Sequence, residues 1–332
     1  MPVIDDRGLE SGWDGCQMLR PVGLRRITHA IHDIDGTHSL IRDWPPVMSL
    51  SIHWAMTCGL KPDFDSPAVV RELVARVGRE PLEETDRFCV ESAGLSALTQ
   101  MEFGIRRAIE LGNVPADPRL ALSAVERRTN SEIIRRIWAG QERFEDLEQP
   151  PGLVEFIAER AGRLFKLYEA VLNGACRDHN TADARTNPAK WRVPGALEFM
   201  EHLRAIGCRN YFVTGAVLYA GGGMLEEVEA VGFRVGPGRA VEAMLGSSWD
   251  KKQPKDEVMR GLFAREGIDP KAALVIGDGR TEIAAGAAFG SVCISRLPDD
   301  ARRQRELHRE LGTNYILRDY TAPELTRLLR KE

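Results

Sequence analysis

The stretch Ile27-Thr28-His29-Ala30-Ile31-His32-Asp33-Ile34-Asp35-Gly36-Thr37 decides the fold. A half-apolar run of strand length ends in two carboxylates, Asp33 and Asp35, and Gly36 and Thr37 then break the run. In an open α/β sheet, ligands bind beyond the carboxyl ends of the strands, so chemistry is expected at this tip. Two carboxylates held close together repel each other unless a cation or a shared proton relieves them. The pattern predicts a metal site or acid–base chemistry, with a plain Asp-Gly surface turn as the alternative.

Length and composition are those of an ordinary globular protein: 332 residues, 43% hydrophobic, 28% charged, net charge −4. The length allows two domains. The small, mixed charge gives no indication of a nucleic-acid partner. No apolar run approaches the roughly 18 residues that span a bilayer, and the first residues lack the pattern of a signal peptide. The six cysteines include no C-x-x-C pair, which indicates free thiols in a reducing compartment. We expect a cytoplasmic protein with no membrane partner; the oligomeric state is open.

Apolar residues recur at three-to-four spacing from about residue 42 to residue 180, which predicts an all-helical region. The expected helices are Val47–Cys58, Pro67–Val77, Glu83–Leu111, Arg119–Ile137 and Leu153–Leu172. The region shows no convincing strand and no internal repeat. Two flanking segments lack a sustained period: residues 1–26 are expected to be an irregular lead-in, and residues 178–187 a polar linker.

Short apolar runs alternate with helical patterns after residue 194. The expected strands are Tyr211–Val213, Ala240–Leu245, Ala272–Ile276, Val292–Ser295 and Tyr315–Leu317. The expected helices are Pro194–Ile206, Met224–Val231, Asp256–Glu266, Glu282–Phe289, Asp299–Leu311 and Pro323–Leu329. Such alternation predicts an α/β fold with a doubly wound parallel sheet. Residues 1–40 and 186–332 would form this core, interrupted by a helical insert over 41–185. Because the insert leaves just after Asp35, we expect it to cover the crevice as a lid.

Four polar features follow expected strands or precede helices in this core. They are Asp33-Ile34-Asp35-Gly36-Thr37; Val213-Thr214-Gly215; the lysines Lys251, Lys252 and Lys255; and Gly277-Asp278-Gly279-Arg280-Thr281-Glu282. In this order they resemble the motifs of the haloacid dehalogenase-like (HAD) hydrolases, which are mostly phosphatases: D-x-D-G-T, a strand-end Ser/Thr, a lysine, and G-D-x-x-x-D/E. The resemblance covers residues 27–38 and about 188–320. It implies a Rossmann-like core and, for the helical insert, a cap of the type called C1.

The residue types suit phosphoryl transfer, which needs an in-line nucleophile and positive charge around the phosphate oxygens. Asp33 is the expected nucleophile and would form an aspartyl phosphate. Asp35 would protonate the leaving alcohol and then take a proton from water. Asp33, Asp278 and the backbone carbonyl of Asp35 offer the hard oxygen ligands that Mg²⁺ prefers. Glu282, one helical turn after Asp278, would support the site from behind these ligands; the alternative is a first-turn acid favoured by the helix dipole.

The phosphate would be bound by Thr214, through its hydroxyl and backbone N–H, with Gly215 permitting close approach of the chain. A lysine must offset the charge of the phosphate and of Asp33. In the family it lies some two dozen residues before the Gly-Asp pair and is commonly followed by Pro. Lys252 has the matching distance, whereas Lys255 directly follows Pro254. We favour Lys252 as the catalytic, phosphate-binding lysine, with Lys255 as the alternative.

Within the family, aspartate at the position of Asp35 favours phosphate-ester hydrolysis or phosphoryl transfer between sugar positions. The resemblance therefore implies an Mg²⁺-dependent phosphatase acting on a small phosphorylated metabolite. The alternatives are a phosphosugar mutase and a non-catalytic binding or regulatory protein that keeps the fold. The sequence departs from the family pattern at two positions: His32 replaces a bulky apolar residue, and His38 stands where Leu or Ile is common. Either histidine could contact substrate or tune Asp35; an ordinary hydrogen-bonding role is the alternative.

Overall fold

The structure is a computed structural model that describes residues 1–41, 43–219, 223–249 and 252–332. The chain forms two compact units. Unit 1 comprises Met1–Arg42, Asn180–Gly246 and Lys255–Glu332, and unit 2 comprises Asp43–His179 and Ser247–Pro254. The expected insert, 41–185, therefore begins two residues early and ends six residues late. A second segment, Ser247–Pro254, which the sequence places in the α/β core, groups with the helices.

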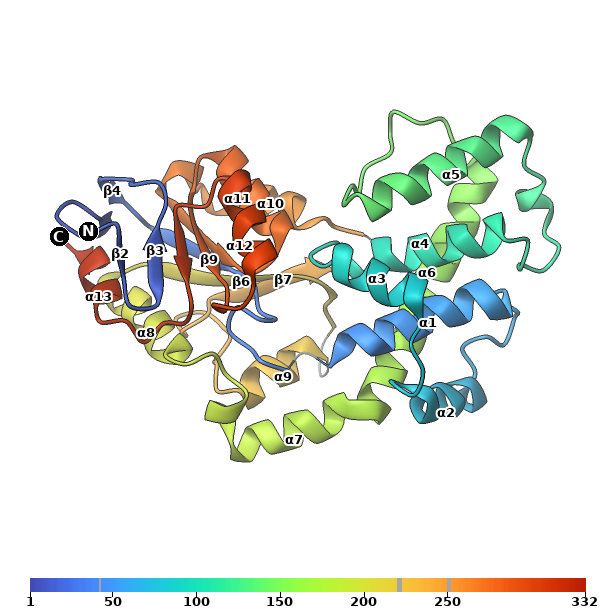
Figure 1. Cartoon of the computed structure of the whole chain (residues 1–332), viewed down its shortest axis with the longest axis horizontal. Helices are drawn as coiled ribbons and strands as arrows, with labels where there is room; N and C mark the ends of the chain where they lie inside the picture. Colours follow the sequence, from blue (N-terminus) through green and yellow to red (C-terminus); the bar gives the residue numbers. More distant parts are fainter. Residues whose placement is uncertain (42, 220–222, 250–251) are drawn as a thin grey trace. The chain divides into compact units, whose positions relative to one another are not determined.

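Unit 1 is built on an eight-stranded sheet with the order β2-β3-β10-β9-β8-β5-β6-β7 (Figure 1). Its strands are β2 (Gly12–Trp13), β3 (Cys16–Met18), β5 (His29–His32), β6 (Arg209–Val217), β7 (Ala243–Ser247), β8 (Ala273–Gly277), β9 (Val292–Arg296) and β10 (Tyr315–Leu317). The five strands from β10 to β6 pair in parallel, and the hairpin β2–β3 adds to β10 in antiparallel. The doubly wound parallel sheet expected from the sequence is confirmed.

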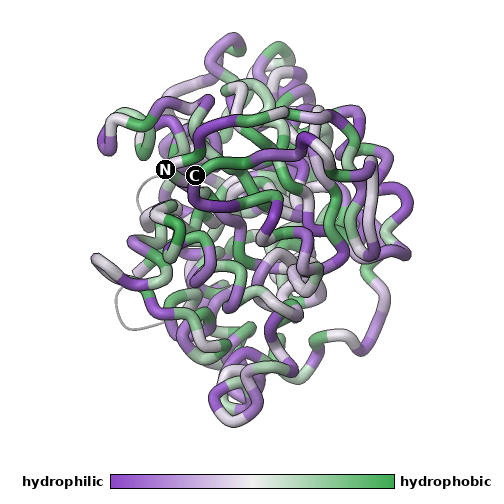
Figure 2. The backbone as a smooth tube through the Cα atoms, turned by 90° about the vertical axis from the view of Figure 1, so that its left-hand side faces the viewer, coloured by the Kyte–Doolittle hydropathy of each residue, from purple (hydrophilic) through white to green (hydrophobic). Residues whose placement is uncertain are grey.

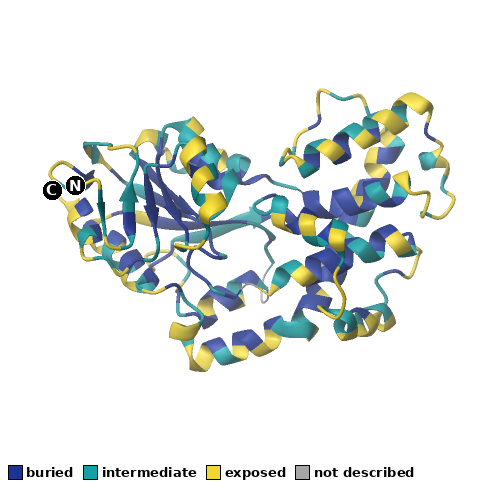
Figure 3. Cartoon of the chain, viewed as in Figure 1, coloured by how far each residue is buried: buried dark blue, intermediate teal, exposed yellow. Residues whose placement is uncertain are grey.

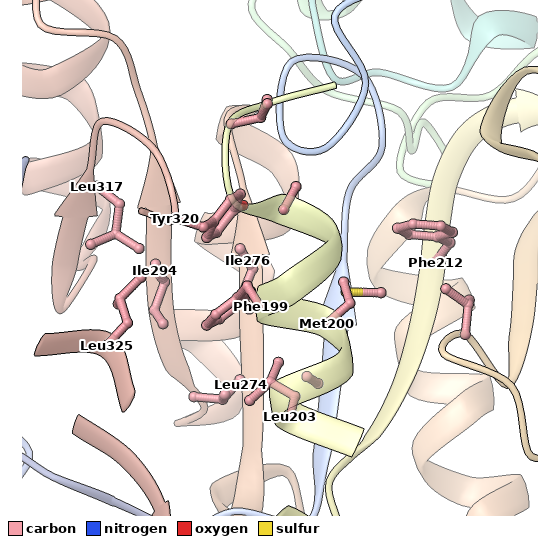
Figure 4. Packing of buried hydrophobic residues seen from close by; sticks show 14 of the residues in the cluster. Phe199, Met200, Leu203, Phe212, Leu274, Ile276, Ile294, Leu317, Tyr320 and Leu325 are labelled. Carbon is pink, nitrogen blue, oxygen red and sulfur yellow. The ribbon is translucent and has the colours of Figure 1, made fainter. Parts of the chain in front are cut away.

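Helices cover both faces of this sheet, because successive strand residues point to opposite sides. On β5, Ala30 belongs to one buried cluster and Ile31 to the other. Figure 4 shows the first cluster, in which Phe199 and Leu203 of α8 pack near Leu274 and Ile276 of β8. The helices of unit 1 are α8 (Ala196–Ile206), α9 (Met224–Ala230), α10 (Lys255–Glu266), α11 (Arg280–Phe289), α12 (Arg302–Leu311) and α13 (Glu324–Leu328), with the short turns η3 (Pro188–Lys190) and η4 (Pro270–Ala272). Figure 3 shows the central strands buried between helices whose outer faces are exposed.

The first 26 residues are not irregular, so that expectation was wrong. They contain β1 (Pro2–Asp5), the hairpin β2–β3 and β4 (Leu24–Arg26). β1 pairs with β4 and with β11 (Leu329–Lys331), which brings the two ends of the chain side by side (Figures 1 and 2). Asp6 fixes the segment, because its carboxylate accepts hydrogen bonds from the amides of Val22 and Gly23 and from the hydroxyl of Tyr315. Strands this short carry too little apolar alternation to be recognised in the sequence.

Unit 2 is helical over residues 43–179, as its spacing predicts. Its elements are α1 (Trp44–Cys58), α2 (Pro67–Arg76), α3 (Glu83–Glu91), α4 (Ala97–Glu110), η1 (Pro118–Leu120), α5 (Ala124–Trp138), α6 (Pro151–Leu172) and the π-helical turn η2 (Asn173–Arg177), which leads into α7 (Asp178–Thr186). The single helix expected over Glu83–Leu111 is two, because Gly94 has a φ of +97° and Ser96 caps the N-terminus of α4. The expected linker 178–187 is largely the helix α7, a polar helix with few buried residues.

Two further observations concern the described residues. All six cysteines are free, as their scattered positions predict. None of the helices in the described ranges has the length and apolar character that crossing a membrane requires.

Candidate active site

The register of the parallel strands brings three of the expected site residues to the same edge of the sheet. His32, the last residue of β5, pairs with Phe212 of β6 on one side and with Ile276 of β8 on the other. Asp33 follows His32 directly, while Thr214 and Asp278 lie two residues beyond the paired positions. The carboxyl ends of β5, β6 and β8 therefore present these residues side by side, where α/β proteins bind ligands.

The loop after β5 turns tightly around the carbonyl group of Ile34. This carbonyl accepts hydrogen bonds from the amides of Thr37, His38 and Ser39, and Gly36 adopts a φ of +73°, which favours glycine. Asp35, which lies in this turn, is half-buried. On the other side of the site, the hydroxyl of Thr37 donates to a carboxylate oxygen of Asp278 at 3.4 Å. Asp33-x-Asp35-Gly-Thr is thus a compact turn beside the end of β8.

Lys255 is the lysine that contacts Asp33. Its ammonium group donates to Oδ1 of Asp33 at 2.6 Å and to Oε2 of Glu282 at 3.0 Å, and all three side chains are at least nine-tenths buried. Lys255 is the first residue of α10, which packs against β6 and α11. Pro254 precedes it, and proline is common at the start of a helix. In the sequence, the signal for Lys255 was its position directly after Pro254.

The preference for Lys252 is corrected by the structure. Lys252 belongs to the segment that groups with unit 2, where its ammonium group donates to Oε2 of Glu102 at 3.1 Å and to the carbonyl oxygen of Glu142 at 3.2 Å. Matching the distance to the Gly-Asp pair was misleading, because the two lysines are only three positions apart in the sequence and yet belong to different units. Lys251, the third member of the cluster, lies outside the described residues.

Glu282 occupies the third position of α11, where it caps the helix and pairs with Lys255; its support of metal ligands stays a prediction. Its Oε1 accepts a hydrogen bond from the amide of Gly279 at the N-terminus of the helix, and its Oε2 binds Lys255. The side chain passes directly over Gly277 and Gly279, so a Cβ at either glycine would collide with the carboxylate. The glycines flanking Asp278 are therefore required by the close approach of Glu282, a reason that the sequence alone did not reveal.

Around Asp33, the side chains that the structure describes bring more negative than positive charge. Burial, together with repulsion from Glu282 and Asp278, raises the pKa of Asp33 to about 7 despite the nearby Lys255. Burial opposes the charge of Lys255, but its ion pairs with Asp33 and Glu282 raise its pKa above the ordinary value. Burial also penalises Glu282, yet the ion pair with Lys255 lowers its pKa. One ammonium group thus compensates Glu282 well and leaves Asp33 short of positive charge.

The donor set fits a small divalent cation. One carboxylate oxygen from each of Asp33, Asp278 and Glu282 lies within 4.8 Å of the others. Because Glu282 already binds Lys255 and the amide of Gly279, the side chains of Asp33 and Asp278 are the better candidates for direct ligands. Hard carboxylate oxygens in small number are what Mg²⁺ uses when it keeps several waters. A cation here would also supply the positive charge that Asp33 lacks.

The sequence predicted Thr214 and Gly215 at the end of their strand, but both residues lie within β6. β6 continues to Val217 because β7 lies beside it and extends the ladder. The hydroxyl oxygen of Thr214 accepts a hydrogen bond from the amide of Ala216 at 3.1 Å. The register places both residues beyond the end of β5, next to the loop that carries Asp33. Their contact with phosphate stays a prediction.

No protein-family model matches the chain, and no curated protein matches it. The chain is similar in fold to solved structures. A hydrolase from Pseudomonas syringae has 13% identity and a TM-score of 0.45, with 88% of this chain and 94% of that one covered. A HAD family hydrolase from Deinococcus radiodurans R1 has 15% identity and a TM-score of 0.40, with 92% and 99% covered. A beta-phosphoglucomutase from Clostridium difficile has 12% identity and a TM-score of 0.44, with 89% and 92% covered.

The chain resembles HAD hydrolases. That resemblance is carried by its motifs and their order; Asp33 and Asp278 directly follow β5 and β8, whereas Thr214 lies within β6 and Lys255 begins α10. A likeness at 12–15% identity and at TM-scores below 0.5 assigns no activity, so the function is argued below from the residues of the site.

Proposed function

We propose that this protein is an Mg²⁺-dependent phosphatase of the HAD type that hydrolyses a small phosphomonoester through an aspartyl phosphate on Asp33. The observation that carries the proposal is the buried cluster of Asp33, Lys255 and Glu282 beside Asp278, at the carboxyl ends of β5 and β8. Burying several carboxylates around a single lysine costs stability unless a bound group offsets their charge. A cluster that lowers the stability of the fold in this way is better explained by a catalytic role than by a structural one.

In the first step, a carboxylate oxygen of Asp33 attacks phosphorus while the bond from phosphorus to the ester oxygen breaks. Asp35 gives its proton to the departing oxygen, which leaves as an alcohol. The ammonium group of Lys255, 2.6 Å from Asp33, orients the nucleophile and offsets the negative charge that phosphate brings. In the second step, water attacks phosphorus and passes a proton to Asp35. The bond to Asp33 then breaks, and inorganic phosphate is released.

Asp33 and Asp278 are proposed to hold Mg²⁺, together with the backbone carbonyl of Asp35. When bound, the ion supplies positive charge to the phosphate oxygens. Glu282 keeps Lys255 and the loop around Asp278 in place through its hydrogen bonds to the ammonium group of Lys255 and to the amide of Gly279. Thr214 is proposed to bind a phosphate oxygen, and Gly215 leaves room for that oxygen to approach the backbone. The proposed nucleophile and acid thus share the loop after β5, while the lysine, the second metal ligand and the phosphate ligand would come from α10, the end of β8 and β6.

The test is hydrolysis of an aryl phosphate and of a panel of small phosphate esters, with Mg²⁺ and with chelator. Wild type is expected to turn over only with Mg²⁺, and Asp33→Asn is expected to lose turnover because the amide cannot attack phosphorus. Lys252→Met is the matched control, since this lysine pairs with Glu102 in unit 2. Turnover that persists in Asp33→Asn, or no turnover of any ester by folded wild type, would contradict the proposal.

A further inference from the structure

Two buried histidines enclose the loop that carries Asp33 and Asp35. His32 ends β5 immediately before the loop, and His38 follows it. Nδ1 of His32 and Nε2 of His38 lie 2.9 Å apart, and neither residue has exposed surface. The hydrogen bond between the rings therefore closes the loop at its base, across the five residues 33–37. Because both rings are fully buried, the structure does not support direct contact between these histidines and substrate.

Asn210 fixes the direction of this hydrogen bond. Its amide nitrogen donates to the carbonyl oxygens of Met200 and Ala240, which leaves its side-chain oxygen as an acceptor. That oxygen lies 3.3 Å from Nε2 of His32, so Nε2 must carry the hydrogen and Nδ1 must be the acceptor. His38 must then donate from its own Nε2. Both rings are neutral Nε2–H tautomers, in keeping with their complete burial.

The far side of His38 is held by Tyr320. The two rings stack with centroids 5.2 Å apart and an interplanar angle of 4°. The hydroxyl of Tyr320 donates to the carbonyl oxygen of Thr37 at 3.1 Å, and Arg296, at the end of β9, donates to the carbonyl oxygen of Gly36 at 2.9 Å. Side chains from outside the loop thus restrain two consecutive carbonyl groups that follow Asp35.

We propose that His32 and His38 are positioning residues, which fix the distance and direction between Asp33 and Asp35 through a neutral, one-way hydrogen bond. The inference rests on the proposed function, because positioning matters only if both carboxylates act on one substrate. Phosphoryl transfer depends on in-line alignment, and a misplacement of about 1 Å can lower a rate by about a hundredfold. The side chain that follows the loop must donate a hydrogen bond to Nδ1 of His32, as His38 does. Leu or Ile in its place would leave that nitrogen without a partner.

The kinetic test compares three variants with wild type. His38→Leu removes the donor and is expected to lower kcat by about 10- to 100-fold while KM changes by less than about twofold, because binding groups stay in place. His38→Gln offers an amide donor and is expected to recover most of kcat. His29→Leu is the matched control: it changes a histidine at the opposite end of the same strand, and kcat is expected to stay within about twofold of wild type. Equal kcat values for His38→Leu and wild type, or equal losses in His38→Leu and His29→Leu, would overturn the proposal.

A spectroscopic test does not depend on turnover. Long-range ¹H–¹⁵N spectra of the imidazole rings in wild type are expected to show both His32 and His38 as Nε2–H tautomers. Amide hydrogen exchange at Thr37, His38 and Ser39, whose N–H groups bind the carbonyl of Ile34, is expected to be slow in wild type. It should be faster in His38→Leu and unchanged in His29→Leu. An Nδ1–H tautomer in either ring, or unchanged amide exchange in His38→Leu, would overturn the positioning role. Both results can be obtained without turnover. A lack of phosphatase activity in wild type would refute only the proposed function.

Discussion

Two buried carboxylates, Glu102 in unit 2 and Asp33 in unit 1, each accept a hydrogen bond from a lysine but differ in how much positive charge they face. In unit 2, Glu102 faces two cations: Arg106 at 2.7 Å and Lys252 at 3.1 Å. The guanidinium group of Arg106 also donates to the side-chain oxygens of Asn130 and Gln149, so most of its donors are satisfied. In unit 1, Lys255 faces both Asp33 and Glu282, with Asp278 beside them.

The pKa shifts follow this difference. Burial penalises Glu102, yet its two cations lower its pKa below the ordinary value. Burial likewise penalises Asp33, but one shared lysine cannot compensate, and its pKa rises to about 7. A buried carboxylate that faces enough positive charge needs no further ion, whereas one that lacks positive charge is suited to receive a cation. Charge balance, more than burial or ion pairing, separates the candidate site from the structural cluster.

The largest expected effect separates the two lysines. Lys255→Met removes the only side chain seen to donate to Asp33 among the described residues, and we expect kcat to fall by about 1,000-fold. Lys252→Met changes a lysine that contacts Glu102 and is expected to leave kcat within about twofold of wild type. Steady-state kinetics with Mg²⁺ measures both. The comparison fails if Lys252→Met loses activity and Lys255→Met does not.

The next effect concerns stability in unit 2. Arg106 is one of two cations that face Glu102, and Arg106→Met would leave Glu102 with Lys252 alone. We expect the free energy of unfolding to fall by about 3 kcal/mol, because breaking a buried ion pair leaves a charge without compensation. Denaturant unfolding followed by circular dichroism measures the loss. The kcat of the folded variant should stay near wild type, and a large drop in kcat with unchanged stability would reverse the roles that we assign to the two clusters.

A smaller effect is the pH dependence of Mg²⁺ binding. Because a cation binds the ionised carboxylate, protons compete with it wherever Asp33 is protonated. With the pKa of Asp33 raised to about 7, the affinity for Mg²⁺ should increase as pH rises toward 7 and level off above it. The increase should approach about tenfold per pH unit on the acid side. Calorimetric titration between pH 5.5 and 8.5 tests this. An affinity for Mg²⁺ that does not change over this range would mean that the cation does not displace a proton from Asp33.

The smallest effect is on the stability of the protein without cation. A carboxyl group whose pKa is higher in the folded than in the unfolded state stabilises the fold at low pH, and this contribution is lost as pH rises through the folded pKa. Ionised Asp33 should therefore cost stability above pH 7, and Asp33→Asn should be more stable than wild type at pH 8 with chelator, by on the order of 1 kcal/mol. Thermal unfolding at pH 5 and pH 8 measures the difference. A variant less stable than wild type at pH 8 would show that Asp33 is already compensated.

The fold class could be predicted because it rests on long, regular patterns. The alternating strands and helices after residue 194 indicated the parallel sheet, and three-to-four spacing indicated the helices of unit 2. The short strands β1 to β4 could not be found, since they are held by pairing with β10 and β11, far away in the sequence. The break between α3 and α4 had a local signal, Gly94 followed by the capping Ser96, which the apolar spacing obscured.

The candidate site could be predicted in part for a similar reason. Asp33, Asp278 and Glu282 lie at or near strand ends, and parallel pairing brings such positions together. The choice between Lys252 and Lys255 depended on which unit each lysine joins, and the distance in sequence carried no information about that. The bond between His32 and His38 was equally hidden. Its direction depends on Asn210, which lies on a different strand and is itself oriented by two carbonyl groups.

The most direct test of the central claim is binding of beryllofluoride, a mimic of the phosphoryl group on aspartate, followed by ¹⁹F NMR with and without Mg²⁺. The charge imbalance in unit 1 predicts tight, Mg²⁺-dependent binding by wild type and by Lys252→Met, and none by Asp33→Asn or Lys255→Met. Absence of binding to wild type, or equal binding to wild type and Asp33→Asn, would show that this cluster is not a phosphoryl-transfer site.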